Sequence, residues 1–137
     1  MFSMKTVTRI VEDEVYETVN ENGNKISIDM REDHVKDSQS PTELLLGAVS
    51  ACVAVDIVSI LRKRKKQIDD FVIETSGKRK EEHPRAFTHI HSKYVLTSPN
   101  VKKEELQKIA GLALDKYCSV ASSLKAEIDY SVEVINP

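Results

Sequence analysis

The chain has 137 residues, of which 40% are hydrophobic and 31% are charged, so its size and composition are those of a single globular domain spanning residues 1–137. A formal net charge of −2 and the absence of Trp leave neither a basic excess for phosphates nor a stacking surface for bases, so we expect no nucleic-acid partner. The N-terminal residues lack the apolar core of a signal peptide, which favours a cytoplasmic protein.

The N-terminal part of the chain is typical of β-strands. Segments that are rich in β-branched residues, or that alternate polar and apolar residues, cover residues 6–11, 15–19 and 25–29. The last two segments flank the pair Asn22-Gly23, which is typical of a tight turn. We therefore predict three antiparallel strands, followed by a polar loop over residues 31–39.

A long apolar helix is predicted next. Ser40 is suited to cap it, Pro41 to occupy its first turn, and Glu43 follows the cap by three residues, as in a capping box. Residues 44–61 are apolar on nearly every face, which is typical of a helix enclosed by protein. The basic residues 62–66 suit its C-terminal end, where the helix dipole favours cations.

The surroundings of this helix also follow from its composition. Its longest apolar run, residues 44–55, ends at Asp56 and is too short to span a bilayer, so we expect no membrane partner. A domain of this size can hardly cover such a helix with its own chain. We therefore predict a homodimer with a large apolar interface.

The second half of the chain is predicted to contain a hairpin, two helices and a last strand. Residues 71–75 and 87–96 would pair across a charged tip at residues 78–85. Ser98-Pro99 would open a second helix. Its apolar face would hold Leu106, Ile109, Ala110, Ala113, Leu114 and Tyr117.

A short helix over residues 119–124 and a strand over residues 128–135 would complete an α+β fold.

On the second strand of the hairpin, His89 and His91 share one face. Two histidines at this spacing are able to bind a metal, but no third ligand is evident. We interpret this face as solvated and expect no metal.

Cys52 and Cys118 are the two cysteines of the chain, 66 positions apart. This spacing is neither that of a disulfide scaffold nor the CxxC-like spacing of a zinc site. In a reducing cytosol such a pair is either buried filling or a redox pair. From the residues alone both alternatives stay open.

Three blocks of the sequence resemble the OsmC/Ohr family. They are SPTELLLGAVSAC with the following DIVSIL (residues 40–52 and 56–61), HPRAFTHIH (83–91) and YCSVASSL (117–124). The resemblance implies an OsmC-like fold, in which an antiparallel sheet packs around two central helices of an intertwined homodimer. It also implies thiol-dependent reduction of organic hydroperoxides in the oxidative stress response.

By match of position, the resemblance makes Cys52 the catalytic thiol that attacks the peroxide and Cys118 the resolving thiol that closes a disulfide. A dithiol reductant would restore both. The chemistry needs a thiolate and a second thiol to capture the sulfenic acid, so no metal or organic cofactor is expected.

Activation of Cys52 is the open question, because the pKa of a free thiol is near 8.5 and burial raises it further. In the family's peroxidases an arginine on an N-terminal strand or loop, held by a glutamate, supplies a cation. Val15 falls about where some relatives carry the arginine, and Arg9 is the nearest alternative upstream. Glu43 stands one position after the family's glutamate, a rotation of about 100° on a helix. Ser119 stands where many members have proline.

Asp56 lies one turn after Cys52, where a buried carboxylate requires a partner. It is a candidate interface or cavity residue, and in ionised form beside the sulfur it would oppose thiolate formation. Whether the chain is an enzyme therefore stays open. The alternatives are a non-catalytic OsmC-like stress protein that binds a small apolar ligand at the dimer cleft, and a protein that senses or exchanges thiols.

Overall fold

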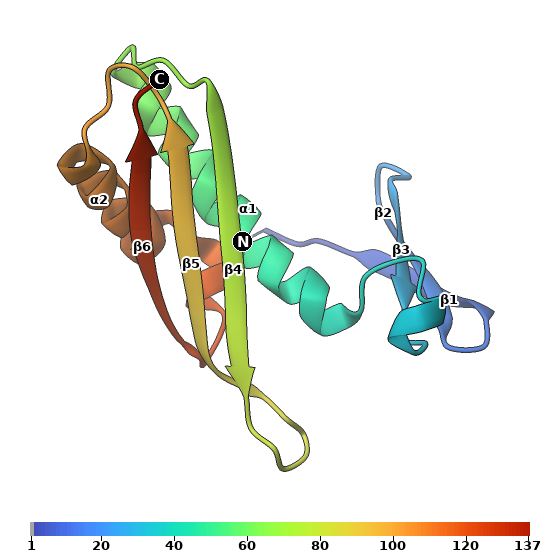
Figure 1. Cartoon of the computed structure of the whole chain (residues 1–137). Coiled ribbons are helices and arrows are strands. Elements are labelled where there is room, and N and C mark those ends of the chain that lie inside the picture. The colour runs from blue at the N-terminus through green and yellow to red at the C-terminus, as the bar shows by residue number, and fades with distance from the viewer. Residues whose placement is uncertain (1) are drawn as a thin grey trace. The chain divides into compact units, whose positions relative to one another are not determined.

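The computed structural model describes residues 2–137 and divides the chain into two units, Met1–Leu45 and Leu46–Pro137 (Figure 1). The first unit holds three strands, β1 (Thr6–Glu12), β2 (Val15–Asn20) and β3 (Lys25–Asp29). They pair antiparallel in the order β1-β2-β3, as predicted. Among the described residues of this unit, only Val15 and Asp29 are buried.

The turn between β2 and β3 forms for the reason that its sequence suggests. Gly23 has a φ of +87°, a conformation that glycine adopts without steric cost. The side-chain oxygen of Asn20 accepts hydrogen bonds from the backbone N–H groups of Asn22 (3.1 Å) and Asn24 (2.8 Å). These contacts fix the register of the hairpin.

The loop after β3 is held by Asp29 and contains the short 3-10 helix η1 (Asp33–Val35). The Arg31 side chain donates to Asp29 at 3.0 and 2.7 Å, and the N–H of Asp37 donates to it at 2.9 Å. The bonds from Arg31 hold the pKa of the Asp29 carboxyl well below its ordinary value, although burial acts in the opposite direction. Arg31 therefore has a structural partner within its own unit.

The helix α1 (Pro41–Lys63) begins in the first unit and continues into the second. The second unit adds β4 (Asp70–Arg79), β5 (Phe87–Thr97), α2 (Lys103–Leu112) and β6 (Glu127–Ile135). Its sheet has the order β4-β5-β6 and is mixed rather than wholly antiparallel, because β6 runs parallel to β5. The helices α1 and α2 lie on one face of this sheet (Figure 1). The predicted α+β class is confirmed.

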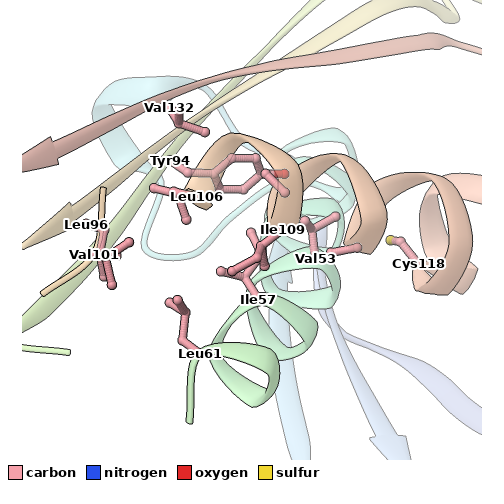
Figure 2. Packing of buried hydrophobic residues seen from close by; sticks show 12 residues of the cluster. Val53, Ile57, Leu61, Tyr94, Leu96, Val101, Leu106, Ile109, Cys118 and Val132 are labelled. Carbon is pink, nitrogen blue, oxygen red and sulfur yellow. The ribbon is translucent and has the colours of Figure 1, made fainter. Parts of the chain in front are cut away.

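The core of the second unit lies between this sheet and the two helices (Figure 2). Alternate residues of β5 are buried because successive side chains of a strand point to opposite faces. On α1 the buried positions recur every fourth residue, which places them on one stripe of the helix. The central members are Val53, Ile57, Leu61, Tyr94, Leu96, Leu106 and Ile109.

The second helix begins later than predicted. α2 starts at Lys103, and Ser98 lies in the preceding turn. There Ser98 Oγ donates to the side chain of Asn100 (3.2 Å) and accepts from its N–H (3.3 Å). The Ser98 side chain is thus used within a local turn, a common alternative to capping a helix. The prediction that Ser98-Pro99 opens the helix is wrong.

A π-helix, η2 (Ala113–Tyr117), separates α2 from the residues that follow. The N–H of Cys118 donates to the carbonyl of Ala113 at 3.0 Å, which closes a turn one residue wider than that of an α-helix. The wider turn rotates Tyr117 off the apolar face. Tyr117 is 51% exposed, so its predicted place on the buried face is wrong.

The helix α1 is long and apolar enough to cross a membrane, judged by length and composition alone. The helix continues through Asp56 to Lys63, so the expectation that the apolar segment is too short is wrong. A core helix of a soluble protein meets the same criteria. One helix of this kind is therefore weak evidence of membrane insertion.

Candidate thiol site

Cys52 lies on α1, beside the stripe that faces the sheet. Val49 and Val53 on that stripe are fully buried, whereas Cys52 is half-buried. It packs against the apolar cluster that contains the buried Cys118, and Val120 and Ala121 pack against the same cluster. The fold thus brings together two cysteines that are 66 positions apart in the sequence.

A chain of hydroxyl groups holds α1 on the sheet two residues before Cys52. Ser50 Oγ donates to the carbonyl of Leu46 at 3.0 Å, so it must accept from Thr75 Oγ1 at 2.5 Å. Thr75 in turn accepts from Ser92 Oγ at 2.8 Å. Each of these hydroxyl groups therefore has a hydrogen-bond partner. The bond between Ser50 and Thr75 also fixes the rotation of α1 about its axis, and with it the direction of the Cys52 side chain.

Cys118 is 3% exposed and lies where η2 ends and the short helix α3 (Ser119–Ser122) begins. Its backbone is extended, with φ −77° and ψ 101°. The sulfur accepts a hydrogen bond from the N–H of Ala121 at 3.3 Å and so caps α3. The π-turn and this cap together fix the orientation of the Cys118 side chain.

The groups near Cys52 lower the pKa of its thiol. Burial alone would raise the pKa of the Cys52 thiol, but hydrogen bonding from the N–H of Val120, the thiol of Cys118, and the hydroxyl and N–H of Ser119 acts on this pKa in the opposite direction. These bonds favour the charged form and together outweigh burial, so the pKa of Cys52 lies below its ordinary value. None of these donors is a charged side chain.

The pKa of Cys118 moves in the opposite direction. Burial raises it, the N–H of Ala121 opposes that effect, and a negative charge on Cys52 raises it further. The two thiols therefore differ in kind: Cys52 is the better thiolate, and Cys118 is the thiol that stays protonated and donates. The lower pKa favours the thiolate at Cys52, which is the nucleophilic form of a thiol.

Tyr94 borders the site from the sheet. It is 1% exposed and stacks between Phe71 and Tyr130, with ring centroids 6.3 and 6.2 Å away. Its hydroxyl end points to the side of the core on which Cys118 lies (Figure 2). Burial raises the pKa of Tyr94 to about 12, although the hydroxyl of Ser92 acts in the opposite direction, so the phenol remains neutral beside the thiol.

The other predicted site residues are placed differently. Arg9 is exposed on β1 opposite Glu17, within the first unit. Glu43 also belongs to that unit, where it accepts from the N–H (3.0 Å) and hydroxyl (2.8 Å) of Ser40 and pairs with Lys36 at 2.5 Å. Glu43 therefore completes the predicted capping box.

Asp56 lies one turn after Cys52 on α1 and is half-buried.

The sequence alone identifies neither Ser119 nor Val120 as a donor to the thiol. Backbone N–H groups carry no signature in a sequence, and Ser119 attracts notice only because many relatives have proline there. Only folding brings these groups close enough to affect the pKa of the Cys52 thiol.

The structural role of Glu43 predicts a specific response to acid. The hydrogen bond from Lys36, followed by those from Ser40, lowers the pKa of Glu43 to about 2. Its stabilising contribution is therefore complete above the ordinary pKa of 4.5 and is lost as the pH falls through about 2. We expect Glu43→Gln to melt at a lower temperature than the wild type near neutral pH, with the gap closing in strong acid.

Thermal melts across this pH range measure the gap, and alkylation of Cys52 near neutral pH provides the control, which should be unchanged. A gap that does not depend on pH would contradict the ion pair.

His89 and His91 share one face of β5, as predicted. Asp129, from the neighbouring strand β6, bonds to His91 Nδ1 at 2.5 Å and to His89 Nε2 at 3.1 Å. Ser131 adds a contact to His91 Nε2 at 3.1 Å. The bond from His91 and the nearby His89 lower the pKa of Asp129. This cluster lies on β5 and β6 and is not among the groups that contact the cysteines.

The family model described as OsmC-like protein matches residues 34–133 of the chain. The chain belongs to the OsmC-like protein family. The OsmC-like chain is 38% identical to Protein YhfA of Escherichia coli (strain K12) over 98 residues, which are 70% of this chain and 73% of YhfA. The resemblance inferred from the three sequence blocks is confirmed.

Solved structures support the OsmC-like fold. The OsmC like protein from Mycoplasma pneumoniae matches with a TM-score of 0.84 and 16% identity, covering 98% of both chains. The organic hydroperoxide resistance protein OhrB of Bacillus subtilis matches with a TM-score of 0.63 and 16% identity, covering 97% of this chain and 98% of OhrB. At these identities the likenesses show the fold alone.

Proposed function

We propose that this OsmC-like protein reduces organic hydroperoxides, with Cys52 as the attacking thiol and Cys118 as the resolving thiol. The observation that carries the proposal is the pairing of the two cysteines in one site, where hydrogen bonds lower the pKa of Cys52 and burial raises that of Cys118. The shared fold with OhrB, an organic hydroperoxide resistance protein, agrees with this substrate class.

The reaction balances with a dithiol as the reductant. The Cys52 thiolate attacks the terminal peroxide oxygen, the O–O bond breaks, and the leaving alkoxide takes up a proton to become an alcohol. The sulfur is oxidised by two electrons to a sulfenic acid. The sulfur of Cys118 then attacks the sulfenic sulfur, and the hydroxyl leaves as water with the Cys118 proton. Two thiol exchanges with the dithiol restore both thiols and oxidise the dithiol to its disulfide.

Neither step needs a metal or an organic cofactor, since the sulfurs of Cys52 and Cys118 supply the two electrons that reduce the peroxide. The dithiol is an external partner, and a reducing compartment would keep both cysteines reduced between turnovers. We therefore propose a cytoplasmic location for the protein.

We further propose that the protein acts as a homodimer. Only 22% of the apolar window of α1 is buried within one chain, and Val55 on this helix is 67% exposed. An apolar groove runs along the same side of the helix. Its lining is Ala54, Val55, Val58, Ser59, Arg62 and Lys63. A second copy of α1 would remove this surface from water.

Peptide mapping after treatment with peroxide tests the function directly. One equivalent of cumene hydroperoxide should convert the reduced full-length chain to a form with a Cys52–Cys118 disulfide. With dihydrolipoamide present, peroxide should be consumed in many turnovers. Two free thiols after excess peroxide, or no turnover with any dithiol, would contradict the proposal.

A second candidate function is binding of a small apolar ligand without turnover. The groove along α1 favours it, because Ala54, Val55 and Val58 give it an apolar surface. Under this alternative both thiols stay reduced in the presence of peroxide, and an apolar fluorescent probe binds to the unreacted protein. A disulfide formed at a low peroxide dose would exclude it as the main function.

A further inference from the structure

The outer face of the second sheet, away from the core, holds a serine, a histidine and an aspartate in hydrogen-bond contact. Asp129 and Ser131 are two residues apart on β6, so their side chains point to the same face. His91, on the neighbouring strand β5, pairs in register with Asp129. Its ring contacts both residues, with Nδ1 2.5 Å from Asp129 Oδ1 and Nε2 3.1 Å from Ser131 Oγ. One imidazole thus joins a carboxylate to a hydroxyl group.

The direction of these two hydrogen bonds follows from the groups that make them. The bond from His91 lowers the pKa of Asp129, so this carboxyl is ionised near neutral pH and can only accept. His91 Nδ1 therefore carries the ring proton. In the neutral ring Nε2 is then an acceptor, and the Ser131 hydroxyl donates to it. His89 Nε2 lies 3.1 Å from the second carboxylate oxygen, so both oxygens of Asp129 are held.

We propose that this cluster is a second active site, which hydrolyses carboxylic esters with Ser131 as nucleophile, His91 as general base and Asp129 as the group that orients His91. A general base must lie within hydrogen-bond reach of the proton that it removes, and the 3.1 Å contact meets this condition. The same arrangement activates serine in unrelated folds, where geometry rather than sequence position defines it. The two thiols take no part in this activity.

The surroundings of the cluster suit a substrate that approaches from solvent. A pocket of about 400 Å³ opens beside His91, a volume that accommodates a small organic group. Lys93 pairs in register with Ser131, and the alternation along β5 puts it on the same face as His91. A lysine there favours the negative oxygen that forms when a serine adds to a carbonyl group. The lining of the pocket is Ser76, Gly77, Lys78, His89 and His91.

The reaction balances without an oxidant or a reductant. Ser131 Oγ bonds to the carbonyl carbon while its proton moves to His91 Nε2, and Asp129 stabilises the resulting imidazolium. The C–O bond to the alcohol then breaks, and His91 passes the proton to the leaving alkoxide. Water attacks the acyl group on Ser131 with His91 again as the base. The carboxylic acid leaves, and the serine is restored.

A fluorophosphonate probe tests the nucleophile, because it bonds to an activated serine and releases fluoride. In the full-length wild type, peptide mass spectrometry should find the label on Ser131. His91→Gln lacks the base and should be labelled at least about 100-fold more slowly, the scale of general base catalysis. A wild type without label on Ser131 would overturn the proposal, and that result does not depend on how any variant folds.

Hydrolysis of p-nitrophenyl acetate gives a second readout. It is measured in the Cys52→Ser/Cys118→Ser background, because a thiolate is itself a nucleophile that takes up acetyl groups. Adding Ser131→Ala should lower kcat/KM about 100-fold.

His34→Gln is the matched control for His91→Gln in this assay. His34 is an exposed histidine of the first unit that pairs with a carboxylate, Glu32, at 3.6 Å. Its replacement should leave the rate of hydrolysis unchanged. Equal losses in His34→Gln and His91→Gln, or an unchanged rate in Ser131→Ala, would show that surface imidazole groups alone hydrolyse the ester and would overturn the role of Ser131.

Discussion

Replacing Cys52 by serine is expected to slow hydroperoxide consumption by more than about 10³-fold, the scale of loss seen when an enzyme's nucleophile is removed. A serine hydroxyl stays protonated near neutral pH, and the donors around position 52 cannot make it an effective nucleophile toward an O–O bond. Consumption of cumene hydroperoxide with dihydrolipoamide as the reductant measures the loss. Full activity in Cys52→Ser would end the proposed mechanism.

Cys118→Ser is the informative partner of this variant. The first reaction should survive, since Cys52 remains and Ser119 and Val120 still lower the pKa of its thiol. One equivalent of peroxide should be consumed, and dimedone should trap a sulfenic acid on Cys52. Turnover should then stop, with further oxidation to the sulfinic acid. If Cys118→Ser loses the first reaction while Cys52→Ser keeps it, the two roles are reversed.

Val55→Asp is expected to weaken the proposed homodimer by at least about 100-fold in dissociation constant, because an unpaired carboxylate would have to enter an apolar contact. Val55 is 67% exposed in a single chain, yet it lies on the apolar groove of α1. Sedimentation velocity over a range of concentrations measures the change. A monomeric wild type would contradict the dimer itself.

Val72→Asp is the matched control for this prediction. Val72 is 47% exposed on β4, between Phe71 and Ile73, which pack into the core. Because side chains alternate along a strand, Val72 points to the opposite face of the sheet. The same change of charge there should leave self-association unaltered. Dissociation of both variants would show that added charge, rather than the α1 surface, is responsible.

Local interactions account for what the sequence predicts well. The three N-terminal strands, the turn at Gly23 and the capping box of Ser40 and Glu43 depend on residues a few positions apart. β3 lies at the predicted residues 25–29 because its alternation and the preceding turn agree. The blocks around Cys52 and Cys118 also predict the family from the sequence, since their resemblance to it lies in short segments.

The sequence predicts less well where a local pattern is compatible with more than one conformation, or where a partner distant along the chain decides the outcome. α2 begins five residues after Ser98 because the Ser98 side chain is held in a turn with Asn100. Tyr117 leaves the apolar face because a π-turn closes on Ala113. The parallel direction of β6 is likewise a property of its partner β5, which a strand's own alternation does not reveal.

By itself, then, the sequence determined the α+β class, the positions of the cysteines and their likeness to a family, because propensity, periodicity and motif are local properties. Only the tertiary structure decided that Glu43, besides completing the capping box, pairs with Lys36, and that Arg31 pairs with Asp29. It also decided that the pKa values of Cys52 and Cys118 shift in opposite directions. The physical reason is that the reactivity of a thiol depends on the donors that folding brings to it, and these include backbone groups that every residue but proline possesses.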